Sequence, residues 1–111
     1  MSTEANSKTV IMNFVDYLNS QEIDKINELY SVQDTQYPHG SEQKQQPIQL
    51  ELARVFPDGH YQTENLLTDN DKVLWHWTYH CPSMDLRGAN MFRAEDGKIV
   101  EDYTVGTISI A

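Results

Sequence analysis

The hydrophobic pattern of this chain changes its period once, at Pro57-Asp58-Gly59. Before that point apolar residues recur at the three- and four-residue spacing of amphipathic helices. After it they alternate with polar residues, as they do in half-buried strands. A chain that places its helices first and its strands afterwards is typical of helices gathered on one face of an antiparallel sheet. The sequence therefore predicts a single α+β domain.

Three helices are expected before this boundary, over residues 8–19, over residues 23–30 and after Pro47. The polar stretch from Asp34 to Gln46 between the last two is expected to be a short extended segment followed by a loop. The apolar faces consist of Val10, Ile11, Phe14, Val15 and Leu18 in the first helix, Ile23, Ile26, Leu29 and Tyr30 in the second, and Ile48, Leu52, Val55 and Phe56 in the third.

Four strands are expected after the boundary, joined by short polar turns that suit antiparallel hairpins. Their predicted ranges are Tyr61 to Thr68, Lys72 to Cys81, Met84 to Ala94 and Lys98 to Ile110. In the second strand, alternation places the bulky set on one face, which we expect to point inward. This set comprises Val73, Trp75, Trp77 and Tyr79.

Composition excludes several classes of protein. With 111 residues the chain has room for one ordinary domain, and its formal charge of -9 disfavours nucleic acid and anionic membranes as partners. Cys81 is the only cysteine, so the chain forms no disulfide with itself and no multi-thiolate zinc site. No apolar run approaches the roughly 18 to 20 residues of a membrane span. These features predict a cytoplasmic protein that is not a membrane protein.

Four segments taken in order carry a resemblance to a known family: LNSQEIDKINELY, FPD, DNDKVLWHWTYH and FRAEDGKIVEDY. Together they span most of the chain and resemble the SnoaL-like polyketide cyclases and ketosteroid isomerases of the nuclear-transport-factor-2-like superfamily. The resemblance implies a cystatin-like conical barrel, usually dimeric, with three N-terminal helices packed on a curved antiparallel sheet and a pocket between them. It implies no particular reaction, because this fold hosts many.

The resemblance also suggests which site residues are present. Alignment on Phe92-Arg93 places Asn90 where steroid isomerases have a protonated aspartic acid that donates to a developing oxyanion, and an amide can also donate. The alternative is a strand asparagine that satisfies a neighbouring polar group. Phe14 replaces the isomerase tyrosine and Tyr37 replaces the general-base aspartate, so steroid isomerisation is not expected. The acid that cyclases carry after the tail aromatic is also absent.

Asp102 is the remaining candidate acid or base. Alternation from Val100 through Asp102 to Thr104 matches the strand face that the family turns inward, and a carboxyl buried against tryptophans would have a raised pKa. The alternative is that a bulge or a shift in register turns Asp102 to solvent, leaving an ordinary aspartate.

The histidines offer weaker candidates. His39 is expected at the pocket mouth, either as a proton shuttle or as a solvated loop residue. His76 and His80 lie two residues apart on one strand face, a spacing that can hold a metal, but no third ligand is evident nearby. We therefore expect neither a metal nor a cofactor.

Two hypotheses for function follow. The first is a pocket for a small apolar or aromatic molecule, with acid-base chemistry carried by Asp102 and Asn90. The second is a non-catalytic dimeric domain with a packed interior that serves in ligand binding or protein association. A homodimer is expected in either case, through an outer sheet face carrying Leu74, Ile108 and Ile110. The predicted pocket residues are Phe14, Tyr30, Tyr37, His39, Trp75, Trp77, Phe92 and Thr104.

Overall fold

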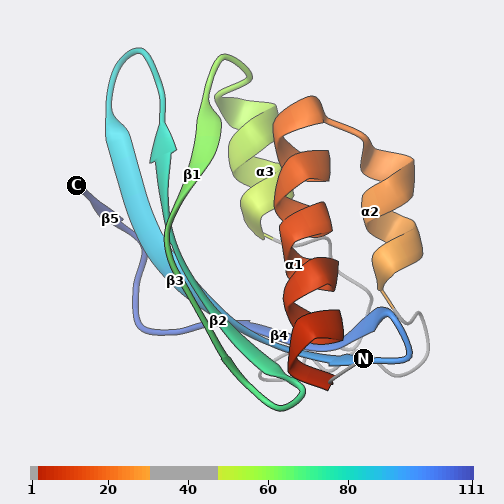
Figure 1. The fold of residues 1–111 in the computed structure, drawn as a ribbon. Helices are drawn as coiled ribbons and strands as arrows, with labels where there is room; N and C mark the ends of the chain where they lie inside the picture. Colours follow the sequence, from red (N-terminus) through yellow and green to blue (C-terminus); the bar gives the residue numbers. More distant parts are fainter. Residues whose placement is uncertain (1–2, 31–47) are drawn as a thin grey trace, which may run out of the picture.

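The computed structural model describes residues 3–30 and 48–111, in which three helices pack on one face of a five-stranded antiparallel sheet (Figure 1). The sheet is strongly curved, and the helices lie in its concave side (Figure 1). This arrangement confirms the predicted fold class. The elements are α1 (Thr3–Ser20), α2 (Ile23–Leu29), α3 (Ile48–Val55), β1 (His60–Asp69), β2 (Lys72–His80), β3 (Asp85–Glu95), β4 (Lys98–Thr104) and β5 (Ser109–Ile110).

The first four strands form a meander in the order β1-β2-β3-β4, and β5 pairs with β3 beyond the end of β4. A continuous strand from Lys98 to Ile110 was therefore a wrong prediction. The chain leaves β4 after Thr104, passes through Gly106 in the left-handed region at φ 73°, and rejoins β3 at Ser109. Glycine adopts that backbone conformation without steric cost, so it permits the break.

The hairpin turns follow from local sequence. The β3–β4 turn consists of Asp96 and Gly97, at φ 52° and 77°, and two positive φ values in succession are the signature of a type I′ turn. The β1–β2 turn is also two residues long and has Asn70 at φ 56°. The Asp-Gly pair and the asparagine tolerate positive φ values, so the antiparallel hairpins turn at the positions that the sequence predicted.

The core lies between α1 and the concave sheet face. Trp75, Trp77 and Tyr79 are at most 1 % exposed, which confirms the predicted inward face of β2. Phe14 of α1 packs edge-on against Phe92 of β3 and Trp75, with ring centroids 5.4 and 6.1 Å apart. These aromatic side chains form the centre of the buried core cluster.

The helices differ from the sequence prediction at several places, and the first is α1, which begins at Thr3 and not at residue 8. The second helix ends at Leu29, and Tyr30 is extended and bridges to Ile99 of β4, so Tyr30 faces the sheet instead of continuing the helix. In α3 the buried positions are Gln49 and Leu50, whereas Val55 is 54 % exposed. Leu52 and Phe56 of the predicted apolar face do pack against the core, so that prediction was right for these two residues and wrong for Val55.

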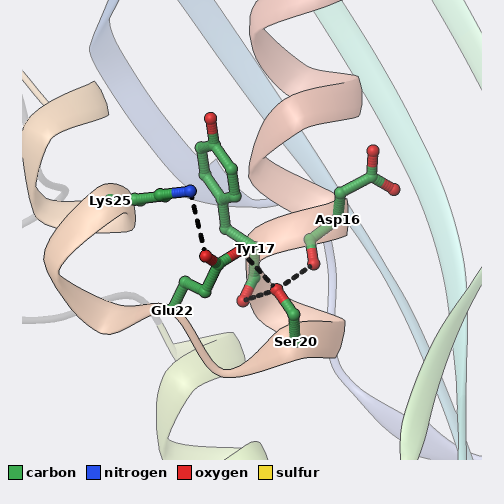
Figure 2. A network of polar contacts seen from close by, with 5 residues as sticks. All are labelled: Asp16, Tyr17, Ser20, Glu22 and Lys25. Atoms are coloured by element: carbon green, nitrogen blue, oxygen red, sulfur yellow. Dashed lines mark hydrogen bonds and ion pairs between the residues drawn. The ribbon is translucent and has the colours of Figure 1, made fainter.

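A polar network at the surface fixes the junction of α1 and α2 (Figure 2). Ser20 Oγ lies 2.9 Å from the Asp16 carbonyl oxygen and 2.7 Å from a Glu22 carboxylate oxygen. Glu22 pairs in turn with Lys25 at 3.0 Å, and the Lys25 ammonium stands 5.5 Å from the centre of the Tyr17 ring. The junction turns sharply at Gln21, where φ is 56°, and so directs α2 toward β4. None of the described helices is long and apolar enough to cross a membrane.

Candidate functional site

Asp102 lies in the interior, with 5 % of its surface exposed. A bulge does occur in β4, since Arg93 pairs with Glu101 but Ala94 pairs with Ile99, which leaves Val100 as the extra residue. The bulge precedes Asp102 and leaves it opposite Phe92, facing inward. The sequence alternative of a solvated Asp102 is therefore wrong. Glu101 points to the other face, where it pairs with Arg93 at 3.3 Å.

Two neutral donors hold the Asp102 carboxyl. The Tyr30 hydroxyl donates to Oδ2 at 2.7 Å, and the Asn90 amide donates to Oδ1 at 2.9 Å. No lysine or arginine in residues 3–30 and 48–111 forms an ion pair with it. Burial raises the pKa of Asp102, and the hydrogen bonds from Tyr30 and Asn90 lower it by less, so the pKa remains above its usual range.

Asn90 is buried on β3 at 2 % exposure and connects Asp102 to two further groups. Its side-chain oxygen accepts from the indole Nε1 of Trp77 at 3.1 Å and from the amide of Gln49 at 2.6 Å. The amide of Asn90 is therefore committed to Asp102 and its oxygen to two donors. In this arrangement Asn90 satisfies neighbouring polar groups and orients the carboxyl of Asp102. Its amide is not free to donate to an oxyanion, which is the role that the resemblance suggested.

Gln49 was missed by the sequence analysis. It lies in the first turn of α3, is fully buried, and its backbone oxygen accepts from the Tyr61 hydroxyl at 2.8 Å. Its side-chain oxygen Oε1 has no hydrogen-bond partner in the described part of the chain. A signal existed in the spacing of Gln49, Leu52, Ala53 and Phe56, which is that of one helical face, but the sequence analysis considered only the apolar residues of this helix.

The structure brings most of the predicted pocket residues together. Phe14, Trp75, Trp77 and Phe92 are all fully buried around the network, and the Phe14 and Tyr30 rings meet edge-on at 6.0 Å. Thr104 is half-buried and pairs with Asn90 across β3 and β4. Tyr37 and His39 lie outside the described residues, so their predicted roles are not addressed by the structure.

The other polar candidates lie on the outer sheet face. His76 contacts Asn65 at 3.1 Å, and His80 contacts Asp85 and Gln62 at 3.0 Å each. Among residues 3–30 and 48–111, no three His, Cys, Asp or Glu side chains gather where they could hold a metal ion. The buried network of Tyr30, Asp102, Asn90, Gln49 and Trp77 is thus the candidate site, and we call it the interior network.

Known proteins that resemble this chain identify its fold class and its family. A curved antiparallel sheet with helices on its concave side is the arrangement that defines the nuclear-transport-factor-2-like fold class. The family model for the SnoaL-like domain matches residues 11–102, so the chain belongs to the family of SnoaL-like domains. No curated protein sequence matches the chain.

Solved structures with the same fold carry several activities in their names. A proposed ketosteroid isomerase from Kribbella flavida shares 18% identity at a TM-score of 0.71, covering 96% of this chain and 83% of its own. IdmH, a proposed polyketide cyclase from Streptomyces antibioticus, shares 17% identity at 0.68, covering 89% and 90%. An LEH-like epoxide hydrolase from M. tuberculosis shares 15% identity at 0.61, covering 92% and 84%. At these identities the likeness establishes the fold alone.

Proposed function

We propose that the concave interior binds a small, largely apolar or aromatic molecule and that Asp102 exchanges a proton with it. The observation that carries this proposal is a buried carboxyl that is held by two neutral donors and has no ion pair with a lysine or arginine of the described residues. A purely structural core has no need of such a group, because removing an aspartate from water is costly. A carboxyl with a raised pKa is suited to acid-base chemistry near neutral pH.

The chemistry uses side chains alone and needs no cofactor. In its neutral form Asp102 gives a proton to an oxygen of the bound molecule. The carboxylate that results is stabilised where it stands by the Tyr30 hydroxyl and the Asn90 amide, which already point at its two oxygens. Asp102 is the catalytic residue in this proposal, whereas Tyr30 and Asn90 position its carboxyl. Isomerisation, cyclisation and hydrolysis all include a proton transfer of this kind.

The aromatic walls support the choice of ligand. Trp75, Trp77 and Phe92 surround the network with apolar surface, which binds flat apolar molecules well. The names of the similar structures include a ketosteroid isomerase, a polyketide cyclase and an epoxide hydrolase, and the proposal for this chain is of the same general kind.

A thermal-shift and fluorescence screen with aromatic ligands tests the proposal. Ligands of the interior raise Tm by mass action and change the emission of the two tryptophans, and Trp77→Phe weakens the emission response. Asp102→Asn keeps the ligand-induced shift but abolishes any turnover. If a chemically broad library changes neither Tm nor emission, the interior is only a packed core and the proposal fails.

We also propose a homodimer through the outer sheet face, and a row of apolar side chains on that face supports it. Leu67, Leu74, Met91 and Tyr103 are consecutive cross-strand partners and form an apolar row across the first four strands. Leu67 is 60 % exposed and Tyr103 is 41 % exposed. A two-fold axis through such a row would bury it against itself. Of the residues predicted from sequence, only Leu74 belongs to this row.

The remaining two predicted residues lie elsewhere because the break at Gly106 changes the register. Ile108 packs against the core near Gly88, and Ile110 pairs with Leu86, a residue of the inner face. Sedimentation tests the dimer: Leu74→Glu should give a monomer, while Met12→Glu, on the helical layer, should leave the dimer intact. A wild-type monomer at high micromolar concentration would rule this interface out.

A cytoplasmic location stays part of the proposal, supported by the single free Cys81.

A further inference from the structure

The hydrogen bonds of the interior network have a fixed direction. An indole N–H can only donate, so the Asn90 atom that faces Trp77 Nε1 must be the side-chain oxygen. The amide nitrogen of Asn90 then faces Asp102, as the 2.9 Å contact requires. Trp77 thus removes the usual ambiguity in which way an asparagine side chain is turned.

The same reasoning fixes the orientation of Gln49. Its nearest atom to the Asn90 oxygen must be a donor, so it is Nε2, which lies at 2.6 Å. The other end of the amide, Oε1, is therefore a carbonyl oxygen. The Tyr61 hydroxyl holds the backbone oxygen of the same residue at 2.8 Å, which keeps the first turn of α3 in place.

The result is one acceptor left without a donor. Gln49 is fully buried, and Oε1 is without a partner among the described residues, whereas Trp77, Asn90 and Asp102 are each hydrogen-bonded through their side chains. A buried carbonyl without a donor is costly, and a turn of the amide would only place two oxygens in contact. Within the described residues, the network therefore presents a fixed, unpaired acceptor on Gln49, a residue that Asn90 links to the proposed acid.

We propose that Gln49 is the residue that determines specificity in this interior, and that its side-chain carbonyl accepts a hydrogen bond from a hydroxyl or N–H group of the bound molecule. This inference rests on the proposed function and names the class of ligand. The ligand is an apolar or aromatic molecule bearing a hydrogen-bond donor, such as a phenol or an enol. A molecule of the same shape with only acceptor atoms would set its lone pairs against Oε1 and bind more weakly.

The test compares two probes of similar size, 2-naphthol and 2-fluoronaphthalene, by titration calorimetry and by the two indole N–H signals in NMR spectra. Wild-type protein should bind 2-naphthol about tenfold more tightly, because a donor then meets an acceptor that is otherwise unpaired. The Trp77 indole signal should shift more than that of Trp75, whose N–H is held by Thr63 away from the network.

Two variants assign the preference to Gln49. Gln49→Met keeps the length of the side chain and removes the acceptor, so the tenfold preference should fall to about one. Asn90 retains its Trp77 donor in this variant, and Tm should not fall by more than a few degrees. Leu50→Met, at the next buried position of α3, should leave the preference unchanged.

The outcomes separate the two proposals. If both probes bind wild-type protein equally, or if the preference survives Gln49→Met, the role of Gln49 is refuted while the pocket stands. If neither probe binds or shifts an indole signal, the proposed pocket itself fails and this inference with it. The comparison in wild-type protein remains decisive even if Gln49→Met does not fold.

Discussion

Two polar networks of the described residues, one at the surface and one in the interior, differ in a way that shows how burial changes the behaviour of a carboxyl group. The network at the α1–α2 junction links Ser20, Glu22 and Lys25 at the surface (Figure 2), and the interior network links Tyr30, Asp102 and Asn90. Both have a carboxyl that accepts at 2.7 Å from a hydroxyl. Hydrogen-bond length alone therefore does not distinguish them.

Their carboxyl groups nevertheless respond in opposite directions. The hydrogen bond from Ser20, followed by that from Lys25, lowers the pKa of Glu22 in an exposed site. Burial raises the pKa of Asp102 more strongly than Tyr30 and Asn90 lower it. Solvent and a nearby ammonium stabilise the charge in one case, and both are missing in the other. The interior network is therefore the one in which burial, and not a hydrogen-bond donor, decides the direction in which the pKa of the carboxyl moves.

The largest difference between the networks is expected when an aromatic member is removed. Trp77→Ala opens a cavity in the core and takes a donor from Asn90, so it should lower the free energy of unfolding by roughly 3–5 kcal/mol. Tyr17→Ala, at the surface junction, should cost less than half as much. Urea unfolding of the two variants measures this contrast. Equal losses would mean that the interior network is no better packed than the surface.

Replacing Asp102 should change how stability depends on pH. Its folded pKa is raised above the unfolded value of 3.8, so the stability it contributes is full below that value and is lost as pH rises through the folded pKa. Asp102→Asn removes this loss and should therefore be more stable than wild type at pH 7–8. Urea unfolding between pH 4 and pH 8 measures it.

Glu22→Gln serves as the opposite control. The pKa of Glu22 is lowered in the folded state, so its contribution is present above the unfolded value of 4.5 and is lost as pH falls. The difference between this variant and wild type should shrink as the solution becomes more acidic. A stability profile of Asp102→Asn parallel to that of wild type would mean that Asp102 titrates as a solvated group.

Removing the hydroxyl donor of the interior network should have a smaller effect on stability than the changes above. Tyr30→Phe takes away the hydroxyl that lowers the pKa of Asp102, so that pKa should rise further and stability should fall by about 1 kcal/mol near neutral pH. Titration of the Asp102 carboxyl carbon by NMR follows the pKa directly. Tyr17→Phe is the matched control and should leave the titration curve unchanged. A lower pKa in Tyr30→Phe would contradict the assigned direction of the hydrogen bond.

The smallest effect is expected from Lys25→Met at the surface junction. This change removes the 3.0 Å pair with Glu22, but exposed ion pairs contribute little and are screened by salt. Tm should change by less than about 2 °C, and the change should diminish in 0.5 M salt, about where screening is nearly complete. A larger loss that resists salt would show that the junction is a structural support comparable to the interior network.

Strand alternation was sufficient to predict the inward face of β2, whereas for Asp102 it left open an inward position and a position turned to solvent. It did not predict the bulge at Val100, because the extra residue is defined only by pairing with β3. The break before β5 was also missed, although Gly106 lies at it. A glycine in an apolar strand pattern can mark a bulge, a bend or a close approach of another chain segment, so it does not by itself predict a break. Tyr30 was assigned to a helix by its spacing and is in fact extended.

The sequence by itself determined the order of the three helices and the first four strands, the positions of the hairpin turns and the aromatic inner face, because periodicity and turn chemistry are local properties. Only the tertiary structure decided that Tyr30, Asn90 and Gln49 meet Asp102, since these side chains come from elements as many as 72 positions apart in the chain. Their contact depends on sheet register, on the turn at Gln21 and on the rotation of α3. Hydrogen-bond direction in the network follows from packing next to Trp77, which no local pattern encodes.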